Sequence, residues 1–124
     1  MNWQNASDIK KSIQALVKKL ELKHIDSQRI ICFRSYGSSS RARARIWSFP
    51  KIWQQALTLP AYYIIEVLSE HFNKLSKDDK TLVLIHELLH IPQNFSGSLL
   101  SHRRPGRNLD SRMVEKLFQK YKDR

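Results

Sequence analysis

The feature that most constrains the fold is an apolar segment, residues 82–91, interrupted by only three polar side chains. These are His86, Glu87 and His90, and every other position of the segment carries Leu, Ile or Val. A helix that is apolar on every side is buried. A buried carboxylate beside two imidazoles is costly unless something pairs with them. The segment therefore predicts an interior helix that holds a polar cluster.

The residues on either side of this segment mark the two ends of the helix. Ser76, followed by Asp79 three positions later, is typical of a helix N-cap, where acidic side chains are also favourable. Pro92 disfavours helical geometry at the residue before it, so the helix should stop just past His90. A turn then follows.

The three polar residues form the pattern His-Glu-x-x-His, which is typical of zinc proteases. Residues four apart lie above one another on a helix, so His86 and His90 can face one ion. Glu87 lies about 100° round the helix from His86, within reach of a water on that ion. We interpret the histidines as ligands of one Zn²⁺ per chain and Glu87 as the catalytic base. The alternative is a core helix with two satisfied histidines and a salt-bridged glutamate.

A third metal ligand is expected after the turn that follows this helix. His102 lies beyond a turn containing Gly97 and can fold back towards the first two histidines. Asp110 and Glu115 are the carboxylate alternatives, but Asp110 suits the start of the last helix. Glu115 falls on the polar side of that helix. His102 is therefore the predicted ligand, and its other interpretation is an exposed loop histidine.

The net charge of +11 at pH 7 is the second indication of function. A strongly basic surface attracts nucleic acids and other polyanions without sequence preference. The sequence contains no zinc-finger, helix-turn-helix or RNA-binding signature that would make this more specific, and a basic composition alone is common. The candidate polyanion-binding residues are Arg41, Arg43, Arg45, Arg104 and Arg107.

The length of 124 residues predicts one domain, residues 1–124, with a single core. No apolar run approaches membrane-spanning length, and the first residues do not begin a signal peptide. Cys32 is the only cysteine and has no internal disulfide partner. These features favour a cytoplasmic protein that does not contact a membrane.

Three runs have the composition or alternation of β-strands: residues 29–34, 41–47 and 62–68. The second run places three arginines and Trp47 on one face and small residues on the other. One of the last two strands is expected to offer its edge to an extended substrate, whose backbone adds as a further strand.

Helices are expected at both ends of the chain. Residues 7–20 form an amphipathic pattern that Ser7 can cap, and a final helix opens at Asn108 or Asp110 and runs to about Tyr121. Residues 49–57 form a short helix or an irregular connection. The prediction is an α+β fold in which a small, mainly antiparallel sheet packs on the metal-binding helix.

Several blocks of this sequence, in this order, resemble a family of predicted metallopeptidases of archaea, bacteria and phages. The blocks are residues 34–38, 40–47, 63–67, 72–76, 85–92 and 95–102. The same order is more loosely similar to SprT/Spartan-like proteases, which act on DNA-associated proteins. The resemblance implies a minimal zincin-like fold with His86, His90 and His102 on zinc and Glu87 as the catalytic base. It does not imply a substrate.

The leading interpretation is hydrolysis of peptide bonds in a protein or peptide substrate, with DNA-associated proteins as one candidate class. The candidate donors to the oxyanion are Tyr36, Tyr62, Tyr63, Arg103, Arg104 and Arg107. One alternative is a basic nucleic-acid-binding protein with a structural or vestigial zinc site. Another is a zinc hydrolase that acts on something other than a peptide.

Overall fold

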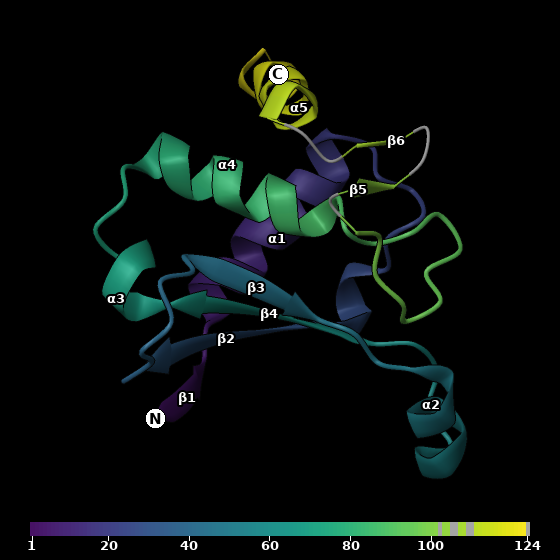
Figure 1. Ribbon diagram of the computed structural model, residues 1–124. Coiled ribbons are helices and arrows are strands. Elements are labelled where there is room, and N and C mark those ends of the chain that lie inside the picture. Colours follow the sequence, from purple (N-terminus) through teal and green to yellow (C-terminus); the bar gives the residue numbers. More distant parts are fainter. Residues whose placement is uncertain (102, 105–106, 109–110, 124) are drawn as a thin grey trace.

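The computed structural model describes residues 1–101, 103–104, 107–108 and 111–123 of the chain. It is built on a four-stranded sheet with strand order β1-β2-β4-β3 (Figure 1). The strands are β1 (Asn2–Asn5), β2 (Ile30–Tyr36), β3 (Ala44–Trp47) and β4 (Tyr63–Leu68). The central pair, β2 and β4, is parallel, and the two outer pairs are antiparallel. The predicted α+β fold with a mainly antiparallel sheet is therefore confirmed.

The sheet differs from the prediction at both of its edges. β1 was not predicted, and its pairing of Asn2 with Tyr36 extends β2 two residues past the expected end. β3 begins at Ala44 rather than at residue 41. Because β4 lies between β2 and β3, its edges are both occupied, and the prediction that it could offer an edge to a substrate is wrong. In the described part of the chain, the outer edge of β3 carries no further strand.

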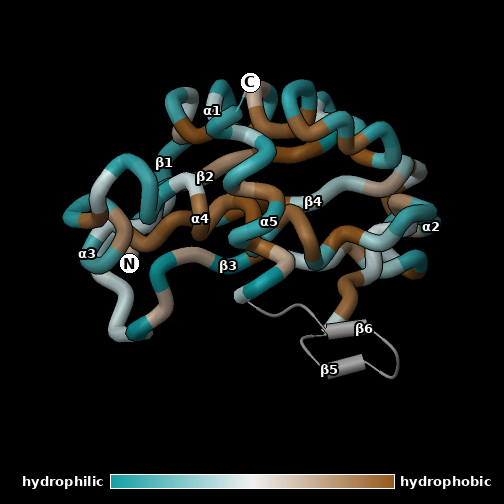
Figure 2. The backbone as a smooth tube through the Cα atoms, turned by 90° about the horizontal axis from the view of Figure 1, so that it is seen from above, coloured by the Kyte–Doolittle hydropathy of each residue, from teal (hydrophilic) through white to brown (hydrophobic). Residues whose placement is uncertain are grey.

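Helices lie on one side of the sheet. The helices α1 (Ser7–Lys19) and α4 (Lys77–Leu88) pack on the sheet, and α5 (Ser111–Lys122) packs on α4 (Figure 1). In α1, hydrophobic residues at helical spacing face the sheet while the outward turns are hydrophilic (Figure 2). The shorter helices are a 3₁₀ turn, η1 (Ser27–Arg29), with α2 (Lys51–Leu57) and α3 (Ser69–Phe72).

The start of α1 lies one residue from the predicted cap. Ala6 occupies the N-cap position, and Ser7 is the first helical residue. The backbone N–H of Ala6 donates to the carbonyl of Cys32 at 3.0 Å, so pairing with β2 fixes where the helix begins. Cys32 itself is buried, with 5% of its surface exposed. Its thiol therefore belongs to the core between sheet and helices.

The helix α4 crosses the middle of the covered face and begins as predicted. The side chain of Ser76 accepts a hydrogen bond from the backbone N–H of Asp79 at 3.1 Å. The regular helix ends at Leu88, earlier than expected, because the chain tightens before Pro92: the N–H of His90 donates to the carbonyl of Glu87, three residues back, at 3.1 Å.

The last helix also differs in its start and in its buried stripe. α5 begins at Ser111, whereas Asn108 lies in β6 (Arg107–Asn108), paired with β5 (Arg103–Arg104). The alternative start, Asp110, lies outside the described residues. Val114 and Phe118 are the buried positions of α5. The helical spacing of Leu109, Met113, Leu117 and Tyr121 predicts that these residues form the apolar side of this helix. Met113, Leu117 and Tyr121 are only partly buried, and Leu109 lies outside the described residues.

Within the ranges that the structure describes, no helix is long and apolar enough to cross a membrane.

Candidate active site

The C-terminal end of α4 and the turn after it bring the three polar residues of the apolar segment together: His86 and Glu87 lie in α4, and His90 lies two residues past its end. The imidazole rings of His86 and His90 are 5.1 Å apart between centroids and inclined at 80°. This is the arrangement expected of residues four apart on one helix face. Two imidazoles at this separation can serve as ligands of a single ion. They are the donor type that suits zinc.

A backbone carbonyl orients the ring of His90. Its Nδ1 lies 2.6 Å from the carbonyl oxygen of Leu100, and the N–H of Leu100 donates to the carbonyl of His90 at 2.8 Å. Because a carbonyl only accepts hydrogen bonds, this geometry assigns the ring proton to Nδ1 and the lone pair to Nε2. Metal-binding histidines are commonly fixed in this way by a carbonyl behind the ring. The residues present therefore fit a metal ion.

The carboxyl group of Glu87 is withdrawn from solvent. Only 7% of the residue surface is exposed. Burial disfavours the charged form and raises the pKa of Glu87 to about 7. A carboxyl group with a pKa near neutrality can accept a proton and return it under the same conditions. This is the property needed in a general base that later acts as an acid.

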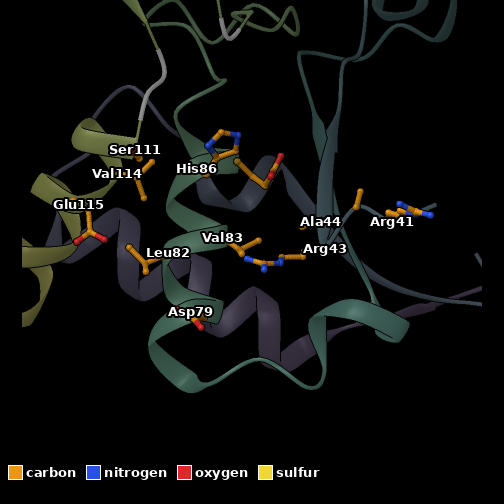
Figure 3. Close-up of a pocket in the computed structure, with 12 residues that line it drawn as sticks. Arg41, Arg43, Ala44, Asp79, Leu82, Val83, His86, Ser111, Val114 and Glu115 are labelled. Atoms are coloured by element: carbon orange, nitrogen blue, oxygen red, sulfur yellow. The ribbon is translucent and has the colours of Figure 1, made fainter.

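Two hollows flank His86 and Glu87. The larger, about 600 Å³, lies between α4, α5 and the segment that leads into β3 (Figure 3). Its lining residues are Arg41, Ala42, Arg43, Ala44, Asp79, Leu82, Val83, His86, Glu87, Ser111, Val114 and Glu115. Figure 3 shows Arg43 extending from the β3 side towards α4. The floor is apolar and the rim carries charges of both signs.

The second hollow, about 540 Å³, lies towards the other end of β3. It is lined by Ala44, Arg45, Ile46, His86, Glu87, His90, Leu99, Leu100 and Ser101. Ala44, His86 and Glu87 are common to both hollows. The candidate catalytic residues therefore lie at the junction of two depressions that follow β3.

The predicted arginines have different surroundings. Arg41 and Arg43 line the larger hollow. The Nε of Arg45 lies 2.9 Å from Oε1 of Glu66, and the indole N–H of Trp47 donates to the same oxygen at 2.9 Å. Burial acts to raise the pKa of Glu66, but these hydrogen bonds outweigh it and the pKa is lowered. The charge of Arg45 is therefore matched within the protein.

The predicted tyrosine donors do not line either hollow. Tyr63 is fully buried; its hydroxyl donates to the carbonyl of Ser98 at 2.8 Å and accepts from the N–H of Gly97 at 2.8 Å. This tyrosine anchors the loop that carries Leu100. Tyr36 lies at the end of β2 opposite Asn2, and Tyr62 lines a separate hollow.

The remaining predicted site residues come after Leu100 in the sequence. His102, the predicted third ligand, lies outside the described residues. The backbones of Arg103, Arg104 and Arg107 lie in the paired strands β5 and β6. Among the residues that the structure describes, no group of three or more His, Cys, Asp or Glu side chains gathers to hold a metal.

Two contributions to the site were not predicted. The carbonyl of Leu100 is a backbone group, so no residue type in the sequence signals its role. Asp79 and Glu115 line the larger hollow. The sequence pattern assigned Asp79 only to the start of the helix, and it gave Glu115 as an alternative third ligand that was expected to face solvent. Glu115 is indeed exposed. Its relation to α4 depends on how α5 packs, which its own helical pattern does not encode.

The chain matches a protein-family model. The family model described as "Putative phage metallopeptidase" matches residues 1–119. Neither the curated proteins nor the solved structures contain a match to this chain.

Proposed function

The chain belongs to the "Putative phage metallopeptidase" family, and from this membership we propose that it is a zinc-dependent peptidase whose general base is Glu87. Membership by itself indicates a metallopeptidase, which uses a metal ion and acts on protein substrates. The observation that carries the finer proposal is the buried Glu87 carboxyl group, set beside two histidines of which one is oriented by the Leu100 carbonyl.

We propose that His86 and His90 hold the ion, with His102 as the third ligand. Imidazole donors on one helix face and the proton placed on Nδ1 of His90 support this assignment. When bound, a zinc ion supplies Lewis acidity that lowers the pKa of a water in the site to about 7. One ion per chain would be expected.

Glu87 carries the proton through the reaction. It accepts a proton from the attacking water as the water oxygen bonds to the scissile carbonyl carbon. It then delivers that proton to the amide nitrogen as the carbon–nitrogen bond breaks. Burial raises the pKa of Glu87 to about 7, and a cation held by His86 and His90 would lower it, which keeps the carboxylate ionised and able to accept the first proton. Burial of Glu87 also limits proton exchange with solvent.

The substrate is proposed to lie extended along the outer edge of β3. Backbone groups on that edge can pair with a peptide as a further strand. The two hollows on either side of His86 and Glu87 can then receive side chains from both sides of the scissile bond. Arg41 and Arg43 at the larger hollow, together with the net charge of +11, support substrates that are acidic or bound to a polyanion such as DNA.

The test compares wild-type protein with Glu87→Gln on an unstructured protein substrate in the presence of zinc. We expect turnover to fall roughly 10²- to 10⁴-fold, because a positioned general base contributes about that factor. Metal content by elemental analysis should not change. Glu70→Gln is the control and should turn over like the wild type, since it neutralises an exposed carboxylate that lines neither hollow. Turnover by Glu87→Gln equal to that of the wild type would overturn the mechanism.

A further inference from the structure

The face of the sheet opposite the helices is apolar and open. Strand register places Trp3 beside Ser35, Phe33 beside Glu66, and Trp47 beside Ile64 on this outer face. Figure 1 shows α1, α4 and α5 on the other side of the sheet; α2 lies beside one end of the outer face, and its Leu57 lines a hollow there. Trp3 is 51% exposed and Trp47 is 46% exposed.

Two hollows lie side by side on the outer face, and Trp47 belongs to both. One, about 430 Å³, is lined by Trp3, Phe33, Trp47, Ser48, Ile64 and Glu66. The other, about 390 Å³, is lined by Ile31, Trp47, Ser48, Phe49, Leu57, Leu59, Tyr62 and Ile64. The half-exposed indole of Trp47 stands next to an apolar depression, so this surface can pack against an identical surface. In a two-fold dimer the indole of each copy would occupy the depression of the other.

The charge distribution favours another copy of the chain over an anionic partner. The residues that line these two hollows include no lysine or arginine. Their one acidic residue, Glu66, is fully buried and paired with Arg45. Arg45 is the cation beside these lining residues: it is paired with Glu66 and lies 5.3 Å from the ring centre of Trp47. Because its charge is matched by Glu66, two copies of a chain with a net charge of +11 can meet here without setting unmatched lining cations against each other. A polyanion finds no unmatched cation among the lining residues.

The exposed apolar area approaches what a dimer needs. Trp3, Ile31, Trp47, Leu57 and Leu59 are each between 39% and 53% exposed. Together they leave on the order of 500 Å² accessible, given the size of aromatic and aliphatic side chains. The half-buried Phe33, Tyr62 and Ile64 add to this, and a standard interface buries about 800 Å² per partner. The largest apolar patch on a typical monomer measures about 300–600 Å² and is often functional.

We propose that the outer face of the sheet binds a second copy of this chain, in a two-fold dimer that packs sheet against sheet. Two β-sheets that pack face to face lie about 10 Å apart, with side chains such as these between them. His86 and Glu87 lie on α4, on the opposite side of the sheet, so the dimer leaves the candidate active site accessible. This inference does not depend on the proposed catalytic function.

The experiment measures molar mass by light scattering over a dilution series. The chain mass is 14.7 kDa, and the wild type is expected to reach twice that value. Trp3→Lys and Leu59→Lys should raise the dimer dissociation constant at least tenfold, because each puts a cation into the apolar contact. Ile52→Lys is the matched control: Ile52 is 76% exposed on α2 but lines neither hollow. This variant should dimerise like the wild type.

A second measurement needs no variant. The chain has three tryptophans, Trp3, Trp47 and Trp53, and all three are exposed in one copy. Dimer formation should therefore shift the fluorescence of the wild type to shorter wavelengths as its concentration rises. A wild type that stays monomeric with constant emission up to about 100 μM would overturn the proposal, even if it captured a different protein. So would a dimer that Trp3→Lys and Leu59→Lys leave intact.

Discussion

Two buried glutamates of the described chain have opposite pKa shifts because their neighbours differ. Burial raises the pKa of Glu87 to about 7. Burial acts in the same direction on Glu66, but hydrogen bonds from Arg45 and Trp47 reverse the shift. One carboxyl group is thus able to exchange a proton near neutral pH, and the other stays ionised and structural. Environment, rather than residue type, separates the two roles.

Glu66→Gln should destabilise the protein in a pH-dependent way. Near neutral pH we expect a loss of about 2 kcal/mol, since hydrogen bonds to a charged group contribute roughly 1.5–3 kcal/mol. The lowered pKa means that the unfolded state takes up a proton first as pH falls. The stabilisation by Glu66 is therefore complete above its ordinary pKa of 4.5 and is lost as pH falls through the lower folded value.

Chemical denaturation of wild type and Glu66→Gln at several pH values measures this effect. The difference between their unfolding free energies should be constant near neutrality and shrink below about pH 4.5, the ordinary value for this group. Glu115→Gln, at an exposed position, should change stability by less than about 0.5 kcal/mol. A Glu66→Gln deficit that stayed the same in acid would contradict an ionised Glu66.

At the scale of elements, the loop after α4 depends on Gly97. Its φ of +95° is unfavourable for other residues, and an added Cβ would lie 2.2 Å from the carbonyl oxygen of Phe49. The N–H of Phe49 donates to the carbonyl of Gly97 at 2.7 Å, and the Tyr63 hydroxyl holds the same residue. The loop therefore reaches Leu100, and through it His90, along a path with no room for a side chain.

Gly97→Ala should cost about 2–4 kcal/mol of unfolding free energy, from backbone strain and a direct clash with backbone. Gly37→Ala is the control, because Gly37 also has a positive φ (+84°) but its added Cβ would find no atom closer than 3.5 Å. It should cost only the strain, about 1 kcal/mol. Equal losses in the two variants, measured by denaturant titration, would show that the close approach at Gly97 does not constrain the loop.

The sequence correctly predicted those features that depend on residues close together in the chain. The start of α4 follows from the hydroxyl of Ser76, and the spacing of His86, Glu87 and His90 follows from helical geometry. β1 was missed because Asn-Trp-Gln-Asn lacks the β-branched residues typical of strands. It pairs through backbone hydrogen bonds with β2, from Asn2 beside Tyr36 to Asn5 beside Phe33, a contact distant in the sequence that composition does not reveal.

The arrangement of the whole molecule was less predictable. The sequence indicated which runs form strands. The order of the strands in the sheet depends on contacts between distant segments, because β4 inserts between β2 and β3. β4 therefore proved central rather than an edge. The prediction that Arg45 and Trp47 lie on one face of their strand is confirmed, since both donate to the same oxygen of Glu66. Their role was not recognised, because their partner Glu66 lies on β4.

Metal binding should stabilise the folded molecule as a whole. A ligand that binds only the folded state adds about 2.7 kcal/mol at a free concentration 100 times its dissociation constant, or roughly 8 °C in Tm for a chain of this size. We expect zinc to raise the Tm of the wild type by about that amount, and a chelator to reverse it. His86→Ala should show little shift.

His71→Ala is the control for the metal experiment, because His71 lies in α3, away from the candidate ligands. It should respond to zinc like the wild type. Calorimetric scans of the three proteins with and without zinc give the comparison. An equal rise in Tm for His86→Ala would mean that zinc binds elsewhere on the chain.

The buried position of Cys32 has a practical consequence for chemical labelling. Burial raises the pKa of its thiol to about 11, and only the thiolate reacts readily with alkylating reagents. The one native cysteine is therefore unreactive in the folded state. A cysteine introduced at the rim of either face becomes the single attachment point for a fluorophore or spin label. Distances across the molecule can then be followed in an otherwise native sequence.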